Sequence, residues 1–122
     1  MMNFAIAVHS CDGAVVIELV GEFDLDAAPT FGTMIAGQLE RGERRFIVDL
    51  DKLTYIDSRG IYALIEMLRA VRAADGDACL VMANPRIARV MTIAGIERAL
   101  PFAADRAGAL AGLRTAVSGA IA

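Results

Sequence analysis

Residues 46–61 read FIVDLDKLTYIDSRGI, and this stretch decides the fold. It opens with Phe46–Leu50, a nearly continuous apolar run of the kind that forms a strand buried on both faces of a sheet. Beyond Ser58 the apolar residues recur at close to helical spacing, at Ile61, Leu64, Ile65, Leu68 and Val71. The stretch therefore predicts a central strand followed by a helix that begins at Ser58.

Two shorter apolar runs, Asn3–Val8 and Ala14–Val20, precede this stretch and read as strands. The Asp12-Gly13 step between them is a strong signal for a tight β-hairpin turn. After the hairpin, apolar residues take helical spacing at Phe31, Met34, Ile35 and Leu39. Asp26 is the expected cap of that helix.

Downstream, strand and helix signals continue to alternate. Ala78–Met82 reads as another buried strand, and Asn84-Pro85 supplies an N-cap followed by proline at the first helical position. Gly95 is expected to end that helix. A short strand is expected over Leu100–Ala103, and its proline would confine it to an edge of the sheet.

Asp105 is the expected cap of a closing helix, which completes the order β, β, α, β, α, β, α, β, α. This order predicts an α/β fold in which helices pack against a mixed β-sheet. No linker or repeat interrupts the pattern, so residues 1–122 are expected to form a single domain.

Composition excludes several classes of protein. The 122 residues carry 12 basic and 15 acidic side chains, a net charge of −3, so the basic footprint of a nucleic-acid binder is missing. No run of about 18 uncharged apolar residues predicts a membrane span. Cys11 and Cys79 form no CxxC pair, which predicts neither a zinc ribbon nor a disulfide framework and favours a reducing, cytoplasmic setting.

The Asp57-Ser58 step lies at the predicted helix start and has two interpretations. In the first, Ser58 is simply the N-cap, and its hydroxyl accepts a hydrogen bond from a backbone N–H of the first turn. In the second, Ser58 is a phosphorylation site, because the unpaired N–H groups and the dipole at a helix N-terminus stabilise a phosphate. A phosphate beside Asp57 would add negative charge and could expel a bound partner.

Several motifs together resemble one family. They are the segment from Phe46 to Ile61, the earlier Gly21-Glu22-Phe23-Asp24, and the later Asn84-Pro85 and Ala94-Gly95-Ile96. The combination covers nearly the whole chain and resembles the STAS domain, which is shared by anti-sigma factor antagonists and the cytoplasmic tails of sulfate transporters. With no predicted membrane span, the resemblance is to the stand-alone antagonists.

The resemblance implies a bacterial regulator that binds an anti-sigma factor with serine-kinase activity and so frees a sigma factor. The family's phosphoacceptor serine falls on Ser58, and its aspartates fall on Asp57 and Asp24. The kinase would phosphorylate Ser58 with its own ATP and inactivate the antagonist, and a phosphatase would restore it. The chain would thus be a substrate rather than an enzyme, with no cofactor of its own.

The expected partner surface comprises Asp24, Asp57, Ser58, Arg59, Gly60, Ile61 and Tyr62. Gly60 is included because a position without a side chain lets a partner backbone approach closely. Arg59 departs from the family, since many members carry a second serine there. An arginine could pair with the phosphate or with Asp57, or alter which partner is accepted.

Two other functions compete with the switch. The chain could be a non-catalytic STAS scaffold in a larger signalling assembly, with Ser58 acting only as a cap or a secondary mark. An enzyme that uses Ser58 as a nucleophile is the weakest alternative, because the single histidine, His9, lies in the first predicted strand. The spacing of Asp24, Asp26 and Asp57 demands no metal ion.

Overall fold

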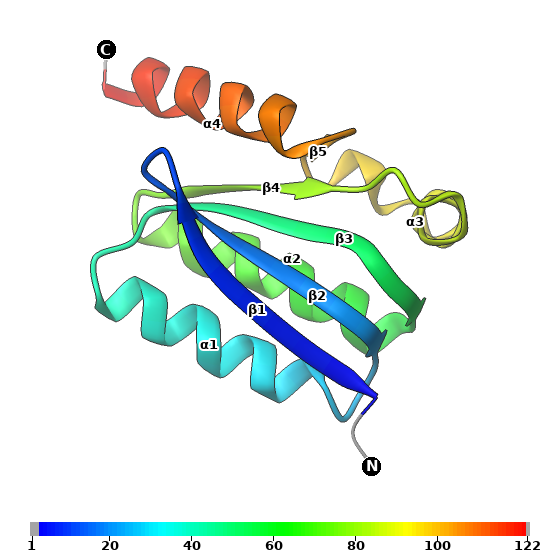
Figure 1. Ribbon diagram of the computed structural model, residues 1–122. Coiled ribbons are helices and arrows are strands. Elements are labelled where there is room, and N and C mark those ends of the chain that lie inside the picture. Colours follow the sequence, from blue (N-terminus) through cyan, green and yellow to red (C-terminus); the bar gives the residue numbers. More distant parts are fainter. Residues whose placement is uncertain (1–2, 122) are drawn as a thin grey trace.

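The structure is a computed structural model that describes the backbone of residues 3–121 and the side chains of residues 3–96 and 98–113. A five-stranded sheet of order β1-β2-β3-β4-β5 has helices on both faces (Figure 1). The elements are β1 (Phe4–Cys11), β2 (Ala14–Phe23), α1 (Ala28–Glu40), β3 (Arg45–Ile56), α2 (Ser58–Ala73), β4 (Asp77–Val81), α3 (Pro85–Ala94), the 3-10 helix η1 (Ile96–Arg98), β5 (Phe102–Ala103) and α4 (Arg106–Ile121). The predicted α/β order is confirmed.

The chain opens with the predicted hairpin. Strands β1 and β2 pair antiparallel, and Cys11 lies opposite Ala14 across a two-residue turn. Both turn residues have positive φ, 50° at Asp12 and 81° at Gly13, as a type I′ turn requires. The later strands all pair in parallel, so the sheet is mixed.

Burial alternates along β2 between the two faces of the sheet. Val15, Ile17 and Leu19 belong to the larger core, which also contains residues of α1, α2 and α3. Ala14 and Val16 belong to a smaller core beneath α4. Because both faces are covered, the central run Phe46–Leu50 of β3 is entirely buried, as its apolar sequence predicts.

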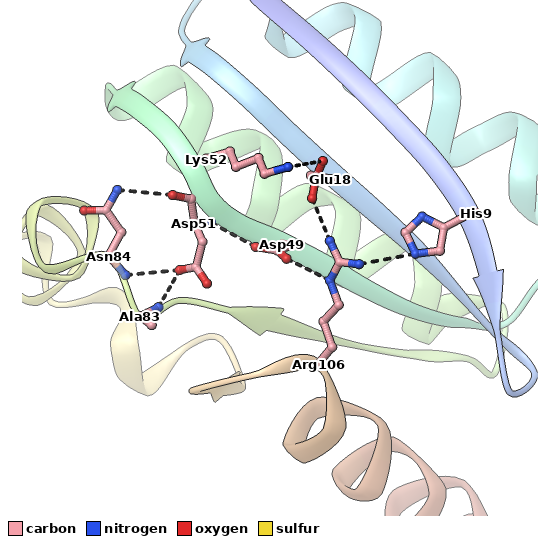
Figure 2. A network of polar contacts seen from close by, with 8 residues as sticks. All are labelled: His9, Glu18, Asp49, Asp51, Lys52, Ala83, Asn84 and Arg106. Atoms are coloured by element: carbon pink, nitrogen blue, oxygen red, sulfur yellow. Dashed lines mark hydrogen bonds and ion pairs between the residues drawn. The ribbon is translucent and has the colours of Figure 1, made fainter.

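A charged network holds α4 against the sheet (Figure 2). Arg106, in the first turn of α4, donates from Nε to Oδ2 of Asp49 at 2.9 Å and from Nη2 to Oε2 of Glu18 at 2.7 Å. Its Nη1 lies 3.3 Å from Nε2 of His9. The hydrogen bond to Asp49, together with the charges of both carboxylates, raises the pKa of Arg106 above its ordinary value. His9 is thereby placed on the α4 face of the sheet.

The start of α1 differs from the prediction that Asp26 caps it. Helix α1 begins at Ala28, and no side chain caps its N-terminus. Instead, Oδ1 of Asp24 accepts hydrogen bonds from the backbone N–H groups of Asp26 and Ala27, both at 3.1 Å. Asp24 directly follows β2, so it closes the turn before the chain reaches Asp26, whose side chain is exposed.

The later elements follow their sequence signals closely. Asn84 caps α3, Gly95 ends it in the left-handed conformation, and Asp105 accepts from the N–H of Gly108 at the start of α4. Strand β5 lies at the sheet edge as predicted, but it contains only Phe102–Ala103. Within the described residues, no helix is long and apolar enough to cross a membrane.

Candidate functional site

The candidate site lies where β2 and β3 end side by side. Phe23 and Ile56 are the last residues of these strands, and they pair with each other in the parallel register. Asp24 follows β2 and Asp57 follows β3, so the two aspartates lie at the same end of these parallel strands. The N–H of Asp57 donates to the carbonyl of Phe23 at 3.4 Å, which connects the two chain segments.

Asp57, rather than Ser58, caps α2. Its backbone is extended, and its Oδ1 accepts from the N–H groups of Arg59 at 2.9 Å and Gly60 at 3.0 Å. The prediction that Ser58 is the N-cap is therefore wrong. A carboxylate one residue earlier already binds the free N–H groups, so Ser58 becomes the first residue of the helix.

Ser58 is consequently free of a structural task. Its side chain is exposed, and its hydroxyl has no hydrogen-bond partner among the described side chains and backbone. The hydroxyl stands at the positive end of the α2 dipole, one residue from the carboxylate of Asp57. This arrangement offers an accessible hydroxyl at the end of the helix where the dipole favours negative charge.

Gly60 and Ile61 do not belong to the accessible surface that the sequence suggested. A Cβ atom at Gly60 would lie 2.2 Å from the carbonyl oxygen of Phe23 and 2.9 Å from Cγ1 of Ile56. The close backbone approach that a glycine permits is thus made within the chain, by the end of β2. Ile61 is buried in the larger core. Both residues therefore support the site from its buried side.

The exposed residues around the start of α2 include both polar and apolar side chains. Arg59 is exposed and forms no ion pair with any other described residue. Tyr62 is 55% exposed and Leu25 is 59% exposed, both high values for large apolar side chains. We call Leu25, Ser58, Arg59 and Tyr62 the Ser58 surface, with half-buried Asp24 and Asp57 beside it.

Sequence reasoning missed Leu25. The signal was its position, a leucine between two aspartates at the end of a strand, where burial is not expected. A serine–histidine–aspartate relay is not assembled, because the chain's one histidine, His9, contacts Arg106 on the other side of the sheet. Among the described residues, no group of three or more acidic, histidine or cysteine side chains could hold a metal ion.

Comparison with known proteins identifies the family. The sequence model of the STAS domain family matches residues 5–109. This range includes all five strands except Phe4, the first residue of β1. The chain belongs to the STAS domain family. The resemblance carried by residues 46–61 and the flanking motifs is confirmed.

Two sequence relatives of this STAS domain bear names of regulators. BtrV of Bordetella bronchiseptica, named as a candidate anti-sigma factor antagonist, is 29% identical over 112 residues, covering 92% of this chain and 97% of that protein. The anti-sigma-B factor antagonist of Staphylococcus aureus is 25% identical over 96 residues, covering 79% of this chain and 89% of that protein.

Among solved structures, the fold resembles SpoIIAA of Bacillus, described as an anti-sigma factor antagonist. The unphosphorylated form superposes with a TM-score of 0.67 at 23% identity, covering 90% of this chain and 98% of that one. The phosphorylated form gives a TM-score of 0.63 at 23% identity, covering 83% and 93%. At this identity the likeness establishes the fold and nothing finer.

Proposed function

We propose that this STAS domain is an anti-sigma factor antagonist that is switched off by phosphorylation of Ser58. Its partner would be an anti-sigma factor with serine-kinase activity, and a serine phosphatase would reverse the modification in the cytoplasm. The names of the two sequence relatives support the class of function. The observation that carries the switch is the exposed Ser58 hydroxyl at the first position of α2, which the fold does not use.

The electrostatic argument for the switch is direct. A phosphate on Ser58 adds about −1.5 to −2 charges at neutral pH. A negative group about 4 Å from this phosphate would be repelled by on the order of 4 kcal/mol at a surface-like effective dielectric. Every 1.4 kcal/mol changes the affinity for the partner about tenfold. Because the attached phosphate would lie at the positive end of the α2 dipole, which favours negative charge, it can repel a partner without unfolding the helix.

The proposed partner contacts are Asp24, Asp57, Ser58, Arg59 and Tyr62, to which the structure adds exposed Leu25. Leu25 and Tyr62 offer apolar contact area, and the polar residues of this set can fix the orientation of a partner. Arg59 carries a cation at the position where many family members have a second serine. We expect it to select among partners, because its guanidinium is unpaired within the described part of the chain.

The phosphorylation experiment uses the serine-kinase anti-sigma factors of the source organism with magnesium and ATP. Intact-mass analysis should show one phosphate on the parent chain and none on Ser58→Ala. Ser10→Ala is the matched control, because Ser10 is also exposed but lies in β1. Phosphorylation of Ser58→Ala to the same extent as the parent would refute the assignment of the site.

A binding experiment separates the switch from a scaffold role. Phosphorylated protein should bind the kinase much more weakly than unmodified protein, and Ser58→Asp should show a smaller loss because one carboxylate imitates a phosphate dianion poorly. Equal affinities of all three forms would eliminate the electrostatic mechanism. Co-purification in a large multi-copy assembly, with no dissociable kinase, would support the scaffold instead.

A further inference from the structure

The two edges of the sheet are finished differently. Strand β5 contains only Phe102–Ala103 and directly follows Pro101, so that edge is short. Strand β1 spans Phe4–Cys11 and pairs with β2 in an unbroken register. It contains no Asp, Glu, Lys or Arg and no proline, the usual devices that prevent an edge strand from pairing with another chain. Among the described elements, no strand lies beyond β1.

The register shows which backbone groups of β1 are free. The N–H of Glu22 donates to the carbonyl of Asn3 at 2.7 Å, so these two residues form a hydrogen-bonded pair at the end of the hairpin. Hydrogen-bonded pairs alternate along an antiparallel ladder. The residues whose N–H and C=O groups point away from β2 are therefore Phe4, Ile6, Val8 and Ser10.

We propose that β1 pairs antiparallel with β1 of a second copy of this chain, with the two-fold axis passing through Ala7. The pairing joins two five-stranded sheets into one continuous sheet. In this register Ile6 lies opposite Val8 of the second copy and Phe4 lies opposite Ser10. Every outward N–H and C=O of these residues then finds a partner, whereas a shift by two residues in either direction leaves one end of the strand unpaired.

The side chains of β1 fit a second copy of the same strand. Because β1 holds no Asp, Glu, Lys or Arg and its His9 would face Ala5 of the second copy, antiparallel self-pairing places no like charges opposite each other. Val8 is 43% exposed in the single chain, and Ile6 of the second copy would cover it. On the opposite face, the two copies of exposed Ala7 meet at the axis, where small side chains permit close approach. This self-complementarity favours a second copy over an unrelated strand.

Light scattering after gel filtration, over a range of concentrations, tests the dimer. The parent chain should shift from monomer to dimer as its concentration rises. Val8→Pro removes an outward N–H without breaking the β1–β2 ladder, so it should weaken self-association about tenfold or more. Val8→Ala keeps the N–H and is the matched control. A parent chain that stays monomeric, or a Val8→Pro variant that associates like Val8→Ala, overturns the proposal.

Cysteine cross-linking tests the register without relying on the proline variant. In a Cys11→Ser background, Ala7→Cys places two cysteines as a non-hydrogen-bonded pair, with Cα atoms about 4.5 Å apart and within disulfide range. Ala5→Cys is the control, because residue 5 faces His9 of the second copy. Buried Cys79, whose pKa is raised by burial and by Asp77, should not react. Cross-linking no faster at residue 7 than at residue 5 refutes the register. This inference is independent of Ser58.

Discussion

Helices α2 and α3 begin in similar ways but are held by different contacts. Each follows a parallel strand and is capped by an aspartate or asparagine side chain. At α3, Oδ1 of Asp51 accepts from the N–H groups of Ala83 and Asn84, and the Nδ2 of Asn84 donates to the carbonyl of Asp51 at 3.4 Å (Figure 2). The same Nδ2 also donates to the carbonyl of Leu53 at 3.1 Å. Pro85, with no N–H and no hydroxyl, follows the cap.

At α2 the cap makes fewer contacts and the support comes from the buried side. Asp57 accepts only from the N–H groups of the first helical turn, and Gly60 lies against the carbonyl of Phe23. The outer side is left to the exposed hydroxyl of Ser58. The difference shows that the start of α3 is held by hydrogen bonds to the preceding strand and presents no hydroxyl. The start of α2 is held by packing on its buried side and presents a side chain that can be modified.

The largest expected effect tests the buried support of α2. Gly60→Ala should destabilise the fold by about 3 kcal/mol or more, because the new Cβ would lie 2.2 Å from a backbone carbonyl oxygen that cannot move alone. The free energy of unfolding from urea titration measures this change. A loss below about 1 kcal/mol would show that the end of β2 yields easily and does not hold α2.

Gly32→Ala in α1 is the matched control for that substitution. Its Cβ would meet nothing within 4 Å, and the residue lies inside a helix. Alanine should therefore stabilise the protein by about 0.5–1 kcal/mol through its higher helix propensity. Opposite signs for the two glycine substitutions would assign the cost at Gly60 to the contact with Phe23 and not to alanine itself.

The next largest effect concerns the hydrogen bonds of Asn84 at the start of α3. Asn84→Ala should cost about 1–3 kcal/mol, because the cap is lost and the carbonyls of Asp51 and Leu53 lose a donor. Asn84→Ser retains a capping oxygen but no amide, so its cost should be smaller. If both variants lose equal stability, the capping oxygen contributes nothing measurable. The hydrogen bonds of the Asn84 amide to the two carbonyls then account for the whole loss.

A smaller effect is expected at the cap of α2. Asp57→Ala should lower the free energy of unfolding by about 0.5–2 kcal/mol, whereas Asp57→Asn should stay within a few tenths because asparagine caps equally well. Chemical denaturation of the two variants side by side distinguishes the hydrogen bonds from the charge. Equal losses would mean that the charge of Asp57 at the helix N-terminus dominates.

The sequence predicted most of the fold because its signals are local. The Asp12-Gly13 turn, the apolar run Phe46–Leu50 and the Asn84 cap each determine their own element, and all three are confirmed. The site was predicted less completely. Two polar residues stand together at positions 57 and 58, and only the backbone conformation decides which of them caps the helix.

Contacts between distant segments could not be predicted in the same way. The burial of Gly60 depends on the parallel pairing of β2 with β3, which brings the carbonyl of Phe23 to it. The network of Arg106 with Asp49 and Glu18 joins three elements that share no motif in the sequence. The open edge at β1 likewise follows from the strand order and not from any residue pattern.

The smallest expected effect on stability is at Ser58 itself. Ser58→Ala should change the free energy of unfolding by less than about 0.5 kcal/mol, because the side chain is exposed and Asp57 already caps the helix. The same variant should lose all phosphorylation at this corner. A loss of stability as large as that of Asp57→Ala would mean that the Ser58 hydroxyl also caps the helix. The residues that start α2 would then have a structural role, as those of α3 do. A neutral change in stability combined with lost phosphorylation would instead separate the two helix starts by function, because Pro85, the residue after the α3 cap, has no hydroxyl that a kinase could modify.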